Sequence, residues 1–270
     1  MRARFEPFGA DHGNGPADAQ YFQLDAEGHR YRAARDARAR SRCGGLASSR
    51  HAAAHAAILE WMRTTLSREH PQLVLPPALR PPADGAQDFA ALDRLVSLLQ
   101  EDVVVVRRLA PECDAVTQMH VCFPSRWRPE RLLGTGFRHI HRPVPGFADG
   151  DSAARRMLDA MILRGPFVRF VWTLCADDAL DQHPDEAGCP GDWDGSGRGW
   201  LRIERQTTVG FPTHESALFL IRTYLRSFSE LDANERRTLA AAIRAMPADV
   251  ARYKGIAGVE RSILRSLARA

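Results

Sequence analysis

The chain has 270 residues, of which 44% are hydrophobic and 26% are charged, and its mean hydropathy is −0.32. No stretch approaches the roughly 18 uninterrupted apolar residues that a membrane-spanning helix needs, and residues 1–7 lack the apolar core of a secretory signal. The five cysteines are scattered and form no CxxC pair, which excludes a disulfide framework and favours a reducing compartment. We therefore expect a cytoplasmic globular protein without a membrane partner.

Positive charge in this chain is carried almost entirely by arginine, because Lys254 is the only lysine and the formal net charge is +4. A GC-rich coding sequence accounts for most of this usage, but a guanidinium can also bind a carboxylate or a phosphate through two hydrogen bonds. The stretch from Arg30 to Arg42 is locally basic, yet no nucleic-acid motif accompanies it. We interpret it as a solvated face and expect no nucleic-acid partner.

The beginning of the chain differs in composition from the rest. Residues 1–45 are rich in Gly, Asp, Pro and Arg and are expected to form an irregular N-terminal segment, with one hairpin-like stretch near residues 21–31. Residues 46–270 are expected to form a single domain. Its first helix is predicted from near Ser49, a plausible N-cap, to just before Pro71, because apolar residues repeat at threes and fours between them.

This predicted helix carries His51 and His55, whose spacing places both imidazoles on one face. Two histidines could share a metal ion, but no third ligand is evident nearby, so a surface or interface role is favoured. The proline-rich residues 75–82 predict an extended linker, and residues 88–99 predict a second amphipathic helix.

The middle of the chain alternates between β-like and helical patterns, and its end is helical. A helix capped by Ser152 is expected to run to residue 163, Asp232 is expected to cap another over residues 235–246, and residues 258–268 predict the last. Residues 176–199, rich in Asp, Gly and Pro, predict a long exposed loop. Helices at both ends around antiparallel strands indicate an α+β fold. Strands are predicted over residues 103–106, 115–123, 167–174, 200–208 and 216–224.

Generic catalytic motifs are absent: the sequence has no GxSxG, no GxxxxGK[ST] and no GxGxxG after a strand. The segment from His139 to Gly146 is chemically distinctive, because Pro143 and Pro145 stiffen an expected extended backbone. A stiff backbone holds His141 in a limited orientation, as an axial metal ligand requires. From these residues alone, a surface loop with two incidental histidines is the alternative.

Six segments, taken in order, resemble the haem-dependent oxidative N-demethylase family, and the resemblance spans roughly residues 20–265. The matching segments are Gln100-Glu101-Asp102, Phe123-Pro124-Ser125-Arg126-Trp127, Ile140-His141-Arg142-Pro143-Val144-Pro145, Arg202-Ile203-Glu204-Arg205-Gln206-Thr207, Phe219-Leu220-Ile221-Arg222-Thr223-Tyr224 and Tyr253-Lys254-Gly255.

The resemblance implies a PAS-like fold, in which a curved antiparallel sheet and the N- and C-terminal helices enclose haem b. It also implies oxidative demethylation of a small amine by molecular oxygen, with release of formaldehyde. Electrons would come from a partner reductase that carries FMN and an iron–sulfur centre and draws on NADPH. The histidine of the matching Ile-His-Arg-Pro-Val-Pro segment is His141, and its position and chemistry make it the expected iron ligand, with His139 as the second choice.

Two of the matching segments carry charged residues inside apolar strands, where charges must be paired or bound to a ligand. Haem carries two propionates, so Arg205 and Arg222 are candidate clamps, and Phe219 and Tyr224 are further cofactor-binding candidates. A buried ion pair between Glu204 and Arg222, without any ligand contact, is the alternative. Glu204 is also a candidate catalytic residue that would bind a protonated amine.

The chain departs from the family in ways that put dimethylamine itself in doubt as the substrate. Family sequences often show Arg-x-Asn-Trp where this chain has Val171 between Arg169 and Trp172, and valine deletes a hydrogen-bonding group. The loop of residues 176–199 is also individual. Cys175 or Cys189 could offer a thiolate to the iron, but a core residue and a loop thiol are the favoured interpretations.

Two rival functions remain at this stage. One is a haem enzyme that oxidises or hydroxylates a specialised metabolite, and the other is a non-enzymatic haem-PAS gas sensor. A homo-oligomer is also left open.

Overall fold

The computed structural model describes residues 5–38, 44–46, 51–75, 86–147, 151–185, 193 and 196–270. In this part of the chain seven strands form one open sheet, in the order β1-β5-β6-β7-β3-β4-β2, and every neighbouring pair is antiparallel. The first long strand, β3, therefore pairs with the last, β7. The strands are β1 (Glu6–Pro7), β2 (Gly44–Leu46), β3 (Glu101–Ala110), β4 (Cys113–His120), β5 (Phe167–Cys175), β6 (Trp200–Phe211) and β7 (Ser216–Ser227).

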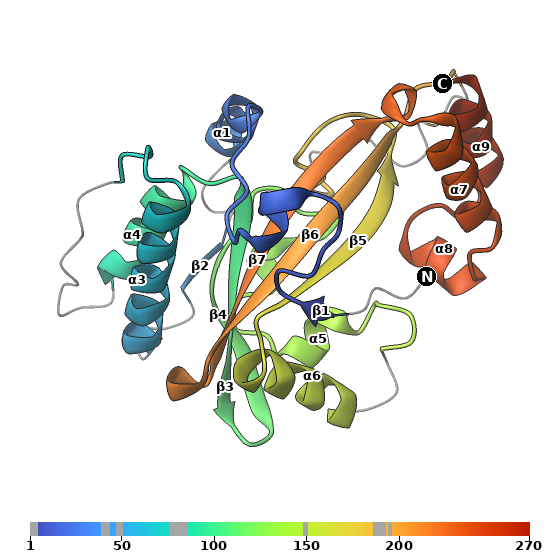
Figure 1. Cartoon of the computed structure of the whole chain (residues 1–270). Helices are drawn as coiled ribbons and strands as arrows, with labels where there is room; N and C mark the ends of the chain where they lie inside the picture. The colour runs from blue at the N-terminus through green and yellow to red at the C-terminus, as the bar shows by residue number, and fades with distance from the viewer. Residues whose placement is uncertain are drawn as a thin grey trace.

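The helices form three groups around this sheet (Figure 1). One group contains α3 and α4, a second contains α5 and α6, and the third contains the C-terminal helices α7, α8 and α9, while α1 stands apart from all three. The α-helices are α1 (Gly28–Ala37), α3 (Ala52–Glu69), α4 (Ala86–Val96), α5 (Phe137–His141), α6 (Asp151–Leu163), α7 (Ala233–Arg244), α8 (Ala248–Tyr253) and α9 (Glu260–Arg269), and short 3₁₀ turns are η1 (Gly15–Ala19), η3 (Pro129–Arg131), η5 (Pro212–His214) and η6 (Phe228–Glu230).

Helices α3 and α4 pack on one face of the sheet. Met62 of α3 and Leu92 of α4 lie in one buried cluster with Val103, Val105 and Leu220 of the central strands. Successive side chains of a strand point to opposite faces, so these alternate residues fill this face while their neighbours fill the other.

Helices α5 and α6 pack on the other face. There Phe137 and Met161 join Val106 and Phe219 in a second buried cluster. Helix α6 lies very close to β6, because a Cβ added at Gly210 would lie 2.2 Å from the carbonyl oxygen of Ile162. Glycine at residue 210 is therefore what allows this helix to approach the sheet.

The C-terminal helices form a third buried cluster at the end of the sheet. Leu174 of β5 packs there with Phe228, Ile243 and Ile263. Helix α7 begins as predicted: the side chain of Asp232 accepts hydrogen bonds from the first turn in a complete capping box.

The α+β class and the five long predicted strands are confirmed, and three local predictions are wrong. Residues 28–37 form α1, so the hairpin-like stretch near residues 21–31 is not a hairpin. The expected extended backbone at His139 is the end of α5. In the predicted exposed loop, Leu180 and His183 are buried, because the loop turns inward and pairs Gln182 with Ser125. Ser49 and residues 76–82 of the predicted linker lie outside the described residues.

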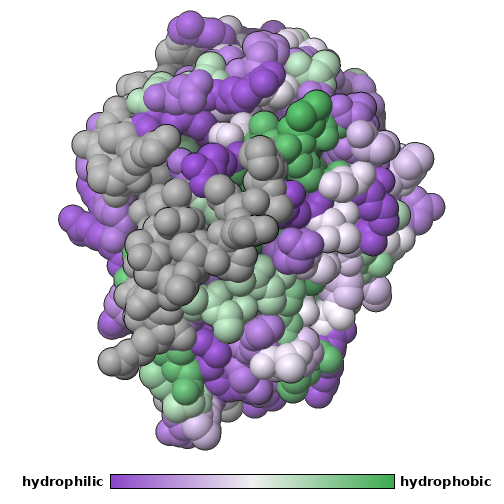
Figure 2. Space-filling view, turned by 90° about the vertical axis from the view of Figure 1, so that its left-hand side faces the viewer, coloured by the Kyte–Doolittle hydropathy of each residue, from purple (hydrophilic) through white to green (hydrophobic). Residues whose placement is uncertain are grey.

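Viewed from the side of α3 and α4, hydrophilic residues surround several separate hydrophobic patches (Figure 2). None of the helices in the described part of the chain is both long and apolar enough to cross a membrane.

Candidate active site

The face of the sheet that α5 and α6 cover is only partly buried in its middle. Helix α6 covers β6 near Gly210. Farther along the same strand Arg202 is fully buried, and its guanidinium donates to the carbonyls of Phe123 at 2.5 Å and Leu180 at 2.8 Å. Between Gly210 and Arg202, the side chains of Glu204 and Gln206 are only partly buried. Five partly buried residues that the pairing register places on this face form what we call the open strip: Arg169, Val171, Glu204, Gln206 and Ile221.

His141 is the last residue of α5 and lies on this side of the sheet. Its ring centroid is 4.2 Å from that of Phe137 and 4.9 Å from that of Phe147, and Phe137 in turn lies 6.2 Å from Phe219. Burial lowers the pKa of His141 to about 4, and the positive charge of Arg169 contributes in the same direction. The imidazole is therefore neutral near pH 7.

The two ring nitrogens of His141 have different surroundings. Nδ1 donates to the carbonyl of Phe137 at 2.8 Å, which places the proton on Nδ1. Nε2 makes no hydrogen bond to the described residues, so its lone pair is available. A neutral imidazole whose second nitrogen is anchored by a backbone carbonyl is the usual form of a metal-bound histidine in proteins.

The open strip carries a chain of polar contacts across two strands. Arg169 Nε donates to Gln206 Oε1 at 2.7 Å, and Gln206 Nε2 donates to Glu204 Oε2 at 2.9 Å. The other carboxylate oxygen of Glu204 lies 3.7 Å from Arg202 Nε, and the Glu204 side chain is 14% exposed. Its carboxylate is thus held in place and still reachable.

The turn that follows α8 lies beside the open strip. Lys254 Nζ donates to the carbonyl of Trp172 and lies 4.8 Å from the centroid of its ring. Arg126, with a left-handed φ of 63°, donates to the carbonyl of Lys254 at 3.2 Å and to the end of β5 at 3.1 Å. Burial lowers the pKa of Lys254 and raises that of Tyr253, and the charge of Glu204 raises both.

The arginines predicted to bind propionates lie on the opposite face of the sheet. Arg205 and Arg222 are directly paired across β6 and β7, and alternation places them on the face that carries Leu220, away from Phe219. Arg205 is 3% exposed and Arg222 is 1% exposed. The structure therefore does not bring these two arginines together with His141.

Arg205, Arg222 and Tyr224 instead bind the N-terminal strap, which we define as residues 18–25. Arg222 donates to the carbonyl of Gln23 at 3.1 Å and to the carboxylate of Asp25 at 2.7 Å. Arg205 donates to the carbonyl of Gln20 at 2.9 Å, and the Tyr224 hydroxyl donates to the Gln23 side chain. The alternative ion pair between Glu204 and Arg222 is also wrong, because the two side chains lie on opposite faces.

The remaining predicted site residues divide between buried and exposed positions. Phe219 is 7% exposed and lies on the same side as His141. His139 is exposed and lines a surface hollow of about 630 Å³ together with Arg138 and Arg142. Of the two histidines, only His141 is half-buried and packs against the aromatic residues beside the open strip.

Val171, where family sequences often have asparagine, lies directly opposite Glu204 in the pairing of β5 with β6. Opposing residues of an antiparallel pair share a face with Cβ atoms about 5 Å apart. The valine therefore removes an amide from the immediate surroundings of the Glu204 carboxylate.

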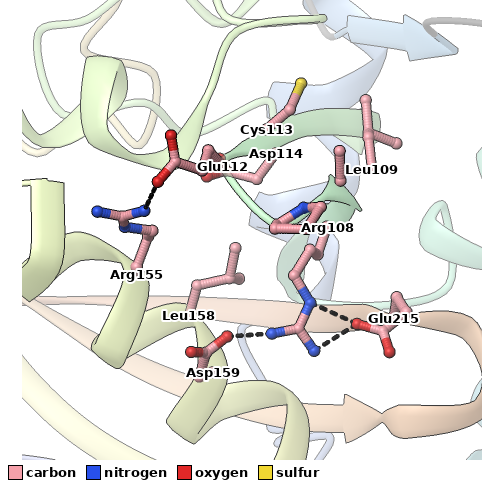
Figure 3. Close-up of a pocket in the computed structure, with 11 residues that line it drawn as sticks. Arg108, Leu109, Glu112, Cys113, Asp114, Arg155, Leu158, Asp159 and Glu215 are labelled. Atoms are coloured by element: carbon pink, nitrogen blue, oxygen red, sulfur yellow. Dashed lines mark hydrogen bonds and ion pairs between the residues drawn. The ribbon is translucent and has the colours of Figure 1, made fainter.

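A second hollow, of about 470 Å³, lies at the hairpin between β3 and β4 (Figure 3). Most of its charged side chains are paired with one another: Arg108 bonds to Asp159 and Glu215, and Arg155 bonds to Glu112 at 2.5 Å. Because these paired charges already neutralise one another, they are not free to bind a ligand.

The two less favoured alternatives, a metal site at His51 and His55 and a cysteine thiolate ligand, gain no support from the described residues. His55 Nε2 lies 3.1 Å from the hydroxyl of Thr117, and His51 Nδ1 lies 2.9 Å from Arg107, so neither is directed at a shared metal ion. The described residues contain no group of three His, Cys, Asp or Glu side chains that could hold one.

Burial raises the pKa of the Cys175 thiol, which disfavours a thiolate, and Cys189 lies outside the described residues.

The structure also places four residues beside the candidate site to which the sequence pattern gave no role: Arg126, Arg169, Gln206 and Lys254. All except Arg169 lie in the segments that carry the family resemblance. The missing information was the register between β5 and β6, which places Arg169 beside Gln206 and Val171 beside Glu204.

A family model described as "Haem-dependent oxidative N-demethylase, alpha subunit-like" matches residues 17–264. The matched range contains the N-terminal strap, His141, the whole open strip and Lys254.

Proposed function

Because the chain belongs to the haem-dependent oxidative N-demethylase, alpha subunit-like family, we propose that it is a haem-dependent oxygenase that oxidises a small amine, with His141 as the protein ligand of the iron. One observation carries the proposal: His141 has Nδ1 anchored on the carbonyl of Phe137 and Nε2 free, next to a partly buried face of the sheet.

The residues around the open strip fit a haem b group. Iron held by a porphyrin needs only one histidine from the protein, and His141 offers the required lone pair. Phe137, Phe147 and Phe219 supply aromatic surface beside it, and Ile221 adds aliphatic surface on the open strip. Haem bound there would supply the activation of oxygen and the transfer of electrons.

The protein's own contribution to the reaction is to bind and orient the amine. Glu204, held by Gln206 at 2.9 Å, can accept a charge-assisted hydrogen bond from a protonated amine. Val171 places a hydrocarbon group beside that carboxylate, where it favours the N-alkyl part of the substrate. Glu204 therefore fixes the nitrogen, and its neighbours exclude water around the carbon that is oxidised.

The proposal extends to the partners and to the fold. Oxygen is the co-substrate, and a reductase with FMN and an iron–sulfur centre delivers electrons from NADPH in a cytoplasmic setting. A PAS-like arrangement is supported by the five long strands, since the first, β3, lies in the centre of the sheet beside the last, β7.

The test is formaldehyde release by the haem-loaded protein with a reductase of this type, NADPH and a panel of N-methyl amines. We expect formaldehyde in proportion to NADPH consumed. Glu204→Gln should lower kcat/KM by about 100-fold, because a charged acceptor becomes a neutral one, while the haem spectrum stays unchanged. Glu112→Gln, in an exposed ion pair with Arg155 at the β3–β4 hairpin, is the control and should keep wild-type activity.

A haem enzyme acting on a larger, specialised metabolite is the second candidate, and Val171 is the observation that favours it. If larger amines shift the Soret band and release product while dimethylamine does neither, this second function is correct. Absence of any oxidised product from every amine would contradict both enzymatic readings and favour a gas-sensing role.

A further inference from the structure

We propose that Arg169 and Lys254 form a carboxylate-binding pair at the edge of the open strip and hold the propionates of the haem. The inference rests on the proposed haem-binding function. It assigns to these two residues the role that the sequence suggested for Arg205 and Arg222.

Arg169 has donors to spare on the side of the sheet where His141 lies. Its Nε is used by Gln206, and its guanidinium carbon lies 4.9 Å from the centroid of the Phe5 ring. The two terminal NH₂ groups make no hydrogen bond or ion pair with the described residues. Burial lowers the pKa of Arg169, and the charge of Glu204 offsets that effect only in part. No carboxylate of the described residues lies within ion-pair distance of its guanidinium.

Lys254 is in a similar situation at the neighbouring turn. Nζ donates one hydrogen bond, to the carbonyl of Trp172, and its other two N–H groups have no partner in the described part of the chain. No carboxylate lies within ion-pair distance of it there. It is also the only lysine among 37 Lys and Arg residues, so a compact ammonium occurs only at this edge of the site.

The other buried arginines are not in this situation. Each of them donates from at least one terminal nitrogen to a carbonyl or carboxylate oxygen of the protein, whereas neither terminal nitrogen of Arg169 has such a partner among the described residues. They are Arg35, Arg38, Arg202, Arg205 and Arg222.

The charge of the site fits a dicarboxylate ligand that reaches His141. Glu204 is the carboxylate of the open strip, and its charge acts on both Arg169 and Lys254. Among the described residues Glu204 is thus the one protein anion whose charge acts on both Arg169, on the open strip, and Lys254, at the neighbouring edge of β5. Glu204 also lies 3.7 Å from Arg202 Nε, so the surplus charge is positive. The two propionates of a haem bound at His141 would meet both cations, and a guanidinium fork can hold a carboxylate by two hydrogen bonds.

The test compares haem with haem dimethyl ester, in which both propionates are esterified and uncharged. The protein without haem is titrated with each porphyrin, and the Soret band reports binding. We expect the wild type to bind haem about tenfold or more tightly than the ester. The ratio of the affinity for haem to the affinity for the ester should fall in Arg169→Met and in Lys254→Met, and it should approach one in the double variant. The affinity of each variant for the ester should stay within about twofold of the wild-type value.

Arg226→Met is the matched control, because Arg226 lies on β7 and is paired with Glu235 at the surface; it should keep the wild-type preference. Lys254→Arg keeps the positive charge, so this variant should retain most of the preference for haem over the ester. If the variants are folded by circular dichroism and weaken both porphyrins equally, or if they leave the preference unchanged, the inference is wrong. If the wild type binds neither porphyrin, the proposed haem function itself fails.

Discussion

Glu204 and Arg205 are neighbours in the sequence, yet they point to opposite faces of β6 and interact with different parts of the molecule. Glu204 faces the open strip and is held by Gln206, where a ligand can reach it. Arg205 faces the N-terminal strap and donates to the carbonyl of Gln20. Two adjacent residues of β6 thus have different roles: Glu204 is a candidate substrate contact, and Arg205 makes a structural contact.

Val171 should limit how tightly the site binds a small secondary amine. In Val171→Asn an amide is placed directly opposite Glu204, so a small secondary amine gains a polar partner. We expect dimethylamine to bind about tenfold more tightly, the equivalent of one added hydrogen bond. The amine-dependent shift of the Soret band measures this affinity.

Val171→Leu is the control for that substitution, since it adds bulk without a hydrogen-bonding group and should not improve dimethylamine binding. Equal affinities in the wild type and in Val171→Asn would show that residue 171 does not contact the amine.

His55 should make the stability of the protein depend on pH. Burial lowers its pKa from 6.5 in the unfolded chain to about 4 in the folded one. Above pH 6.5 both states are neutral and the stability is complete, whereas between pH 6.5 and 4 the unfolded chain takes up the proton first, so stability falls as the pH falls. The wild type should lose about 1–2 kcal/mol more than His55→Gln between pH 7 and pH 5.

Urea unfolding of the haem-free proteins at the two pH values measures this difference. The same loss of stability in His55→Gln as in the wild type would mean that other groups cause the pH dependence.

The N-terminal strap is a structural element held down by buried charge. Arg222 is 1% exposed and pairs with Asp25, so Arg222→Gln leaves polar groups of the strap unpaired and should cost about 3–5 kcal/mol of unfolding free energy. Arg226→Gln, on the same strand but in a surface pair with Glu235, should cost no more than about 1 kcal/mol. Urea unfolding would separate the two, and similar losses would contradict the assigned role of the strap.

The contact between α6 and β6 depends on Gly210. In Gly210→Ala the added Cβ would lie 2.2 Å from the carbonyl of Ile162, so the helix must move off the sheet, at a cost of about 1–3 kcal/mol. Because α6 borders the open strip, haem affinity should fall as well.

Gly134→Ala is the comparison for this substitution. Residue 134 has a left-handed φ of 80° but free space for a Cβ, so only local backbone strain of about 1–2 kcal/mol is expected and haem affinity should be kept. Unchanged haem affinity in Gly210→Ala would show that α6 does not shape the site.

For the whole molecule, the pattern of apolar residues was sufficient to predict the class of fold. The Val103–Val106 run and the alternation in β5, β6 and β7 predicted strands that the structure contains, and the capping signal at Asp232 located α7. The order of the strands did not follow from those patterns, because it depends on contacts between residues far apart in the sequence.

The candidate site could be predicted only in part, because it also depends on contacts between residues far apart in the sequence. His141 and Glu204 lie on one side of the sheet, whereas Arg205 and Arg222 do not, and alternation alone could not tell which face of β6 the histidine approaches. His141 also lies at the end of a helix, although the two following prolines suggested an extended backbone. Its Nδ1 bond to Phe137, four residues earlier, is a consequence of that helix.

The visible spectrum of the purified protein after haem reconstitution tests the central claim most directly. We expect a Soret band in the wild type and in His139→Ala, and loss of the stoichiometric, histidine-ligated spectrum in His141→Ala. A wild-type protein without a Soret band, or a His141→Ala spectrum identical to that of the wild type, would contradict the assignment of His141 as the iron ligand of a haem enzyme.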